Sequence, residues 1–272
     1  MYLAIDIGAT KTLLVVFNQK GKVMKKLRFP TSTSDKSFLS DLSSTLQTIK
    51  RFRFPISRIV CAVPGAEQKN YTFLLGNRDW LNFTPLPIIK SVFSCPVNCY
   101  NDANLGALYE TSFYSGRIVY LTFSTGIGGG IAENGHLLER LSNQFEPGSQ
   151  MYIYGDQKLK WGDIASARAV STIYQTLSTK IRAKKPLQDI AYRISLGLTD
   201  IIRTYRPDII IFGGHLGSIL PRYRRPLIRE LRAHLTSSAT PVEIPKLVVA
   251  RHPDNSTIHG CLKKLKELDG DA

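Results

Sequence analysis

Asp102 is the acidic residue whose surroundings suggest chemistry most clearly. It lies in YNDANLGALYE, after the strand-like stretch CPVNCY and before a run of helix-forming residues. A carboxylate held at the end of a strand can accept a proton from a hydroxyl while that hydroxyl attacks a phosphoryl group. Asn101 beside it could form a hydrogen bond to a neighbouring hydroxyl of a polyol. The alternative is that Asp102 only caps the following helix, which aspartate does well.

Two glycine-bearing turns could hold phosphate groups through their backbone N–H groups. The first, AIDIGATKT, adds the hydroxyl of Thr10 and the ammonium of Lys11, while Asp6 could orient a hydrated magnesium ion. The second, FSTGIGGGI at residues 123–131, has four glycines in five residues, and their entropic cost on folding favours a close approach to a ligand. Neither turn matches a dinucleotide fingerprint or a P-loop, and each could instead be a plain hairpin turn.

A third segment, IIIFGGHLGS at residues 209–218, runs a predicted strand into Gly213 and Gly214. Two residues without side chains could let a nucleobase or ribose lie against the backbone. A simple strand-to-helix turn explains the same residues equally well.

These segments lie at strand ends in a chain that alternates strands with helices, which predicts an α/β protein. Residues 2–29 predict strand, turn, strand, turn and strand, and residues 117–141 repeat that order, which indicates two related lobes. Residues 142–162 are too long for an ordinary connection, so we expect a functional segment there. The periodicity predicts an amphipathic helix over residues 35–51, capped by Ser34 or Asp35. Further strands are predicted at 58–63, 208–214 and 246–250, and helices at about 163–182, 187–205, 221–236 and 255–268.

Charge and composition limit the function further. The 272 residues contain 36 Lys and Arg against 21 Asp and Glu, and the net charge of +15 favours an anionic partner such as a nucleotide, polyphosphate or nucleic acid. The four cysteines form no CxxC pair and the five histidines are scattered, so we expect neither a zinc site nor a disulfide framework. The sequence shows no secretory leader and no membrane-spanning run, which predicts a soluble cytoplasmic protein without a membrane partner.

In order and approximate spacing, six segments resemble those of the ROK family of sugar kinases, the bacterial glucokinase-like group of the hexokinase and actin superfamily. They are AIDIGATKT, VPGA, NDANLGALYE, STGIGGGI, EPGS and IIIFGG, and together they extend over nearly the whole chain. The resemblance implies an actin-like ATPase fold of two ribonuclease-H-like lobes, with ATP and sugar in a central cleft. The smaller lobe would comprise residues 1–105 and the C-terminal helix 255–269, and the larger lobe residues 106–254.

The resemblance also implies a role for each matching residue. Asp102 would be the catalytic base that activates the sugar hydroxyl, and Asp6 would orient Mg²⁺ through water. The sugar-binding positions would be Asn77, Asn101, Asp102 and Glu146. The phosphate and adenosine segments would contribute Gly8, Thr10, Lys11, Thr125, Gly126, Gly128, Gly213 and Gly214.

Three positions depart from the family pattern. Ser149 in EPGS stands where the family has a histidine that binds sugar or zinc. Residues 150–162 contain neither Cys nor His where many members have a cysteine-rich zinc loop, so no zinc is expected. If Ser166 is the family serine of the following helix, the second sugar-binding glutamate has Gly162 as its ungapped counterpart. Asp163, one residue further on, could replace it.

The resemblance predicts an ATP- and magnesium-dependent phosphotransferase of carbohydrate metabolism that acts on a hexose hydroxyl, most simply that of glucose. Alternatives are a polyphosphate-dependent glucokinase, suggested by the positive charge, and an N-acetyl-hexosamine kinase. A catalytically weak sugar sensor, suggested by Ser149 and the uncertain second carboxylate, belongs to another class. The N-terminus has no room for a winged-helix DNA-binding domain, and no other DNA-reading element is evident. Family members are often dimers or tetramers, so we expect a homodimer.

Overall fold

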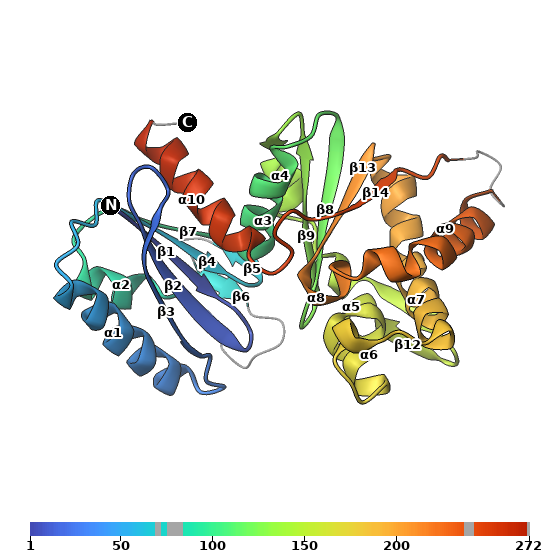
Figure 1. Cartoon of the computed structure of the whole chain (residues 1–272), viewed down its shortest axis with the longest axis horizontal. Coiled ribbons are helices and arrows are strands. Elements are labelled where there is room, and N and C mark those ends of the chain that lie inside the picture. Colours follow the sequence, from blue (N-terminus) through green and yellow to red (C-terminus); the bar gives the residue numbers. More distant parts are fainter. Residues whose placement is uncertain (69–71, 75–83, 237–241, 271–272) are drawn as a thin grey trace. The chain divides into compact units, whose positions relative to one another are not determined.

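The protein divides into two compact units, each built around its own five-stranded sheet (Figure 1). The computed structural model describes residues 1–68, 72–74, 84–236 and 242–270. Unit 1 comprises Met1–Tyr109 and Thr257–Ala272, and unit 2 comprises Glu110–Ser256. The chain therefore passes from unit 1 into unit 2 inside one helix, and it returns at the start of another.

The sheet of unit 1 has the strand order β3-β2-β1-β4-β7. Its first three strands pair antiparallel, whereas β1, β4 and β7 pair parallel. This arrangement brings the carboxyl ends of β1 and β7 to the same edge of the sheet, as in other α/β sheets. The strands are β1 (Tyr2–Ile7), β2 (Lys11–Phe17), β3 (Val23–Pro30), β4 (Arg58–Val63) and β7 (Val97–Asn101), and β5 (Ala66–Gln68) pairs with β6 (Thr72–Leu74) outside this sheet.

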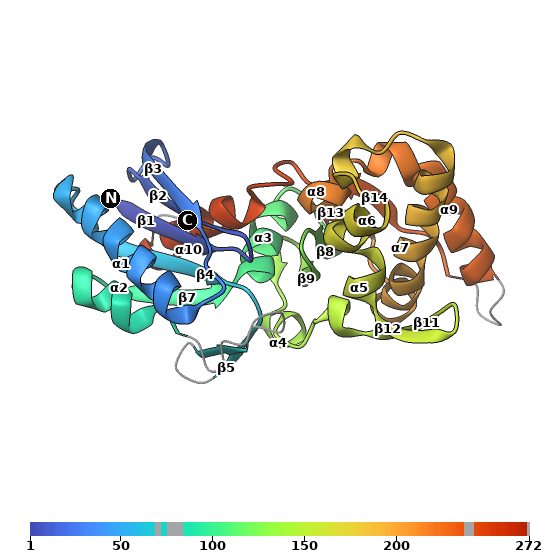
Figure 2. The same ribbon diagram turned by 90° about the horizontal axis from the view of Figure 1, so that it is seen from below.

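Helices cover both faces of the unit 1 sheet (Figures 1 and 2). On one face lie α1 (Asp35–Arg51) and α2 (Leu86–Val92), whose apolar side chains form a core with β1, β4 and β7. The predicted bounds of α1 and its cap are confirmed, since the Ser34 side chain accepts a hydrogen bond from the Ser37 N–H. On the other face lie α3 (Asp102–Thr111) and α10 (Ser256–Asp269).

The sheet of unit 2 repeats the plan of unit 1, with the order β10-β9-β8-β13-β14. Its first three strands pair antiparallel and β8, β13 and β14 pair parallel, which confirms the repeat predicted from the sequence. The last strand of the hairpin is shorter than predicted, because Glu139–Ser142 forms the short helix α4. The strands are β8 (Arg117–Phe123), β9 (Ile127–Glu133), β10 (His136–Leu137), β13 (Ile209–Gly213) and β14 (Lys246–Val249).

Two long helices, α7 (Lys184–Tyr205) and α9 (Leu220–Thr236), lie side by side in unit 2 and bury their apolar faces in its core (Figures 1 and 2). The predicted single helix at residues 163–182 is wrong. The chain forms α5 (Trp161–Ala165), α6 (Ala167–Ile173) and the 3₁₀ turn η3 (Ser178–Lys180), because Ser166 is extended and its side chain caps α6. The short helix α8 (Gly214–Gly217) precedes α9. Among the described helices, none is both long and apolar enough to cross a bilayer.

The stretch predicted as a long functional connection has secondary structure of its own. After the 3₁₀ turn η2 (Pro147–Ser149), β11 (Met151–Tyr154) and β12 (Gln157–Lys160) form a hairpin. The hydroxyls of Tyr152 and Tyr154 donate hydrogen bonds to Asp200 and Asp189 of α7. The stretch therefore contains a structured hairpin tied to α7, and its predicted functional role stays a prediction.

Glu110, near the end of α3, is a buried carboxylate that organises the segment before α10. It accepts hydrogen bonds from the backbone N–H groups of Arg251 (2.8 Å) and His252 (3.1 Å) and from the Ser256 hydroxyl (2.7 Å). All four residues belong to unit 2. A buried charge of this kind is tolerated because three donors surround it.

We predict that Glu110→Gln lowers the free energy of unfolding by about 1–3 kcal/mol, because an amide turns one acceptor into a donor that faces buried N–H groups. Chemical denaturation monitored by circular dichroism measures the change. The control is Glu139→Gln, at an exposed position of the same unit. Equal stability of the Glu110 variant and the wild type would contradict the role of this carboxylate.

Candidate active site

Asn101, the last residue of β7, fixes the start of α3. Its side-chain oxygen accepts a hydrogen bond from the Asn104 N–H (2.9 Å), and its side-chain NH₂ group donates one to the Gly65 carbonyl (2.8 Å). The first bond has the geometry of a helix cap, because it satisfies a backbone donor of the first turn. The second bond ties the turn after β4 to the same point. Asn101, and not Asp102, is therefore the residue that caps α3.

Asp102 is the first residue of α3, and its partly buried carboxylate accepts hydrogen bonds from the backbone. The Ala103 N–H lies 2.8 Å from its Oδ1 atom. Burial raises the pKa of this carboxyl to about 6, although the backbone N–H groups of Ala103 and Asp102 lower it. A carboxylate of this pKa is ionised at neutral pH and is basic enough to take a proton.

Asp6 lies at the end of β1, in the same unit as Asp102. Burial, and then the negative charge of Asp102, raise its pKa to about 7, although the Lys11 ammonium opposes the rise. Because the charge of Asp102 disfavours ionisation of Asp6, a divalent cation nearby would offset the unfavourable negative charge. Among the described residues, no group of three or more His, Cys, Asp or Glu could hold a metal alone. The donor set therefore fits Mg²⁺ held largely by water and phosphate oxygens, with Asp6 as its protein neighbour.

The turn between β1 and β2 is tight and partly satisfied by its own backbone. The Gly8 N–H donates to the Lys11 carbonyl at 3.0 Å, and a Cβ at Gly8 would lie 2.9 Å from that oxygen. Gly8 is thus required by the turn, and its N–H is used within it. The exposed side chains of Thr10 and Lys11 remain available to an anion.

The turn between β8 and β9 is shorter than the glycine pattern predicts. It spans Ser124, Thr125 and Gly126, because the other three glycines of the segment, at 128–130, lie inside β9 and pair with β8. The Ser124 N–H donates to the Gly126 carbonyl at 3.0 Å. A Cβ at Gly126 would meet no atom within 4 Å, so the protein's own packing does not require glycine there. That open space is compatible with a ligand lying against the backbone of the turn.

The Gly213–Gly214 segment lies beside the Ser124 turn, because β8 and β13 are parallel neighbours. Gly214 has φ +73°, and a Cβ there would lie 2.5 Å from the Phe123 carbonyl and 2.6 Å from the Ser124 hydroxyl. A Cβ at Gly213 would overlap the Tyr120 hydroxyl. Both glycines are therefore required by packing within unit 2. Unit 2 therefore brings together the two segments that the sequence analysis predicted to hold phosphate and adenosine.

Glu146 and Asp163 lie on neighbouring elements of unit 2. Glu146 is partly buried and precedes η2, which packs against both β9 and α5. Asp163 lies on α5, and its side chain is 54% exposed and forms an ion pair of 3.9 Å with Arg168. A Cβ at Gly162 would lie 3.2 Å from the Gly148 carbonyl, which shows how closely η2 and α5 approach. Asn77 lies outside the described residues.

Two residues that the sequence analysis missed contact the helix of Asp102. The Thr257 hydroxyl donates a hydrogen bond to the Asp102 carbonyl at 3.3 Å. Gly260 packs against the Leu105 carbonyl so closely that a Cβ would overlap it. A glycine inside the helix predicted at 255–268 was a sequence signal for close packing. Thr257 is distant from Asp102 in the sequence, and no sequence signal pointed to its contact.

Comparison with known proteins gives evidence on the family of the chain that does not depend on the geometry of the site. Residues 2–142 match the model of the ROK family. A fructokinase from Lactococcus lactis subsp. cremoris is 26% identical over 231 residues, which cover 78% of this chain and 78% of that protein. A xylose repressor from Bacillus spizizenii is 26% identical over 205 residues, which cover 66% of this chain and 52% of the repressor.

Among solved structures, a ROK family glucokinase from Streptomyces griseus, in complex with glucose and AMPPNP, is similar with a TM-score of 0.80. It is 18% identical and the match covers 97% of this chain and 98% of that one. At this identity the similarity establishes the fold alone. The expected α/β fold, the actin-like ATPase fold with ribonuclease-H-like halves, is confirmed.

The raised pKa of Asp102 leads to a prediction about stability. Because its pKa in the folded protein is about 6, against an ordinary value of 3.8, the carboxyl stabilises the fold below about pH 4, and this contribution is lost as the pH rises through 6. Asparagine resembles the neutral carboxyl at every pH. We therefore expect Asp102→Asn to raise the free energy of unfolding by about 1–2 kcal/mol at about pH 8, allowing for partial exposure, and to have little effect near pH 4.

Denaturation of both proteins across this pH range measures the difference. Asp163→Asn is the matched control, because that carboxylate is exposed and the change should stay within about 0.5 kcal/mol. A variant no more stable than the wild type at alkaline pH would contradict a destabilising charge at position 102.

Proposed function

We propose that the chain, which belongs to the ROK family, is an ATP-dependent sugar kinase that phosphorylates a hydroxyl of a hexose, glucose or a near relative. The observation that carries the proposal is the placement of Asp102. Its carboxylate is partly buried and ionised at neutral pH, and the caps and contacts around it hold α3 in place. The glucose and AMPPNP in the similar Streptomyces griseus structure support the choice of substrates.

In the proposed reaction, Asp102 accepts the proton of the attacking sugar hydroxyl. A bond forms between that hydroxyl oxygen and the γ-phosphorus of ATP, and the bond from that phosphorus to the bridging oxygen of ADP breaks. The carboxylate keeps acceptor capacity for this task, because an ionised carboxylate has about four lone-pair sites. Its basicity, near neutrality, suits a general base.

The remaining candidate residues have positioning roles. Asn101, Asn77, Glu146 and Asp163 would orient the sugar hydroxyls, which raises the rate by fixing the attacking oxygen. Asn101 already bonds to Gly65 and Asn104, so its contact with sugar would use its remaining donor and acceptor capacity. Thr10, Lys11 and the turn of Thr125 and Gly126 would hold the phosphates, and Gly213 and Gly214 would lie against the adenosine. Gly8, whose N–H is used within its turn, and Gly128, which lies in β9, would keep the two turns in shape.

Magnesium would be held by Asp6 through water and by the phosphate oxygens of the nucleotide. When bound, it neutralises the charge that develops on the phosphoryl group. Lys11, whose ammonium lowers the pKa of Asp6, would add positive charge at the same end of β1. This arrangement also favours ionised Asp6 at neutral pH.

A catalytically weak sugar sensor is the second candidate function. Two observations favour it: Ser149 replaces the histidine of the family motif, and one similar protein is a xylose repressor. The exposed position of Asp163 leaves the second sugar carboxylate weakly held. A sensor would bind sugar without turnover, which separates it from a kinase.

The first test is ADP release from ATP and Mg²⁺ with glucose, fructose, mannose, N-acetylglucosamine and N-acetylmannosamine, with polyphosphate as a second donor. We expect turnover of at least one sugar above the no-sugar background, because the base and both phosphate turns are present. The same sugars are tested for thermal stabilisation of the protein. Stabilisation by a sugar that no donor phosphorylates would contradict the kinase and favour the sensor.

Asp102→Asn tests the catalytic role on the sugar found. We predict that kcat falls by about 10²–10⁴-fold, because the amide cannot accept the proton. The Kd for sugar, measured by calorimetry, should change little because asparagine retains the shape and an acceptor. Asp163→Asn, the control, should alter KM for sugar more than kcat. Retention of full kcat in Asp102→Asn would rule out Asp102 as the base.

A further inference from the structure

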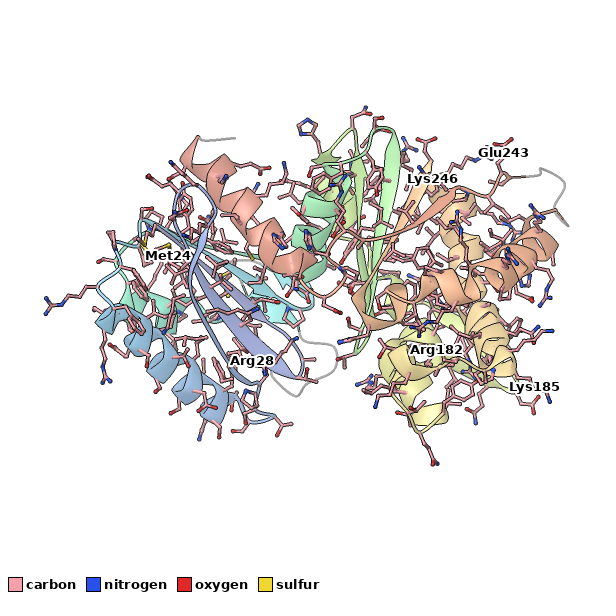
Figure 3. The ribbon with its side chains drawn as sticks, viewed as in Figure 1. Met24, Arg28, Arg182, Lys185, Glu243 and Lys246 are labelled. Carbon is pink, nitrogen blue, oxygen red and sulfur yellow. The ribbon has the colours of Figure 1, made fainter. Side chains whose placement is uncertain are left out.

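Arg182 and Arg222 converge on the same two carbonyl groups at the end of η3. The Nη1 atom of Arg182 lies 2.7 Å from the Thr179 oxygen and 3.0 Å from the Ile181 oxygen. The Nη1 atom of Arg222, from α9, lies 2.6 Å and 3.3 Å from the same oxygens. Two guanidinium groups from separate elements are thus held side by side, and Figure 3 shows Arg182 on this part of unit 2, beside α9.

Neither arginine forms an ion pair within the part of the chain that the structure describes. The four hydrogen bonds given above all use the Nη1 atoms. Close in the sequence to the two arginines are further exposed cationic residues: Lys180, Lys184, Lys185, Arg224 and Arg225. Burial, and then the charge of Arg182, lower the pKa of Arg222.

Capping of η3 explains only part of this arrangement. The Nη1 atoms satisfy the carbonyls at the end of the 3₁₀ turn, which a single arginine would also do. The Nε and Nη2 edges of both groups are left over, and each such edge is a rigid fork that matches two oxygens of a phosphate. Because two like charges held together are unfavourable, a bound dianion would stabilise the pair.

We propose that Arg182 and Arg222 form a binding site for a phosphoanion, an inorganic phosphate or a short phosphate chain, on unit 2. The anion would bridge the two guanidinium forks, with Lys180 and Lys184 adding to the local positive potential. Neither arginine belongs to the glycine turns assigned to ATP, and the proposal does not depend on the proposed kinase activity. The net charge of +15 favours the encounter with such an anion. The arginine pair, and not the net charge, determines where the anion would bind.

The test is isothermal titration calorimetry of the full chain with pyrophosphate as the probe, at about 0.15 M salt so that diffuse surface charge is screened. In Arg182→Gln/Arg222→Gln we expect binding at least about tenfold weaker than in the wild type, because both forks are lost. The matched control is Arg224→Gln/Arg225→Gln, which removes the same charge from exposed positions of α9 and should weaken binding by less than about twofold. Thermal unfolding verifies that each variant is folded.

A second variant keeps the charge and removes the forks. Arg182→Lys/Arg222→Lys should bind pyrophosphate several-fold more weakly than the wild type, because an ammonium cannot make the bidentate contact. Arms with orthophosphate and with ADP identify the source of the phosphate group. Since η3 packs against α8, which begins at Gly214, the titration is repeated with saturating AMPPNP.

Four outcomes would overturn the proposal. They are the absence of pyrophosphate binding by the wild type, equal weakening in the Gln pair and its control, undiminished binding by the Lys pair, and loss of binding when AMPPNP is present. The last would assign the anion to the nucleotide site. A chain that fails to bind AMPPNP but retains Arg182-dependent pyrophosphate binding would contradict the kinase and leave this site intact.

Discussion

The two hydrogen bonds of the Asn101 side chain are the constraint on which the rest of the candidate site depends. They join the turn after β4 to the first turn of α3, so that Asp102 begins the helix and does not cap it. From the other side, the Thr257 hydroxyl and the close contact of Gly260 with Leu105 hold the same helix turn. The Asn101 side chain and these contacts therefore fix the position of Asp102 through its helix.

The fixed position has an electrostatic cost. Asp6 and Asp102 are partly buried in one unit, each pKa lies well above its ordinary value, and the charge of Asp102 raises that of Asp6. Raised pKa values of this kind are common where a protein positions groups for binding a cation or for proton transfer. Glu110 of unit 2 is also a buried carboxylate, and it accepts hydrogen bonds from two backbone N–H groups and the Ser256 hydroxyl.

Much of the fold was predictable from periodicity, including α1, the strand-turn-strand repeat and the α/β class. The errors arose where a local signal depended on tertiary contacts. Ser166 breaks the helix predicted at 163–182, and Tyr152 and Tyr154 anchor a hairpin for which the sequence analysis predicted no secondary structure. In the site, the sequence pointed to Asp102 but left open whether this residue caps α3. The answer depends on which side chain accepts the hydrogen bond from the Asn104 N–H, and that is seen only in the structure. The sequence also could not reveal Gly213 and Gly214 as packing requirements.

The central claim is that Asp102 is a destabilised carboxylate kept ready to accept a proton. It is tested most directly by the pKa of the Asp102 carboxyl, measured by carbon-13 NMR over a pH titration, with Asp102→Asn used to assign the signal. The account predicts a midpoint near 6, and a lower midpoint for Asp6 in the Asp102→Asn protein, because one neighbouring charge has been removed. A midpoint near the ordinary 3.8 would contradict it, since Asp102 would then be a solvated surface acid.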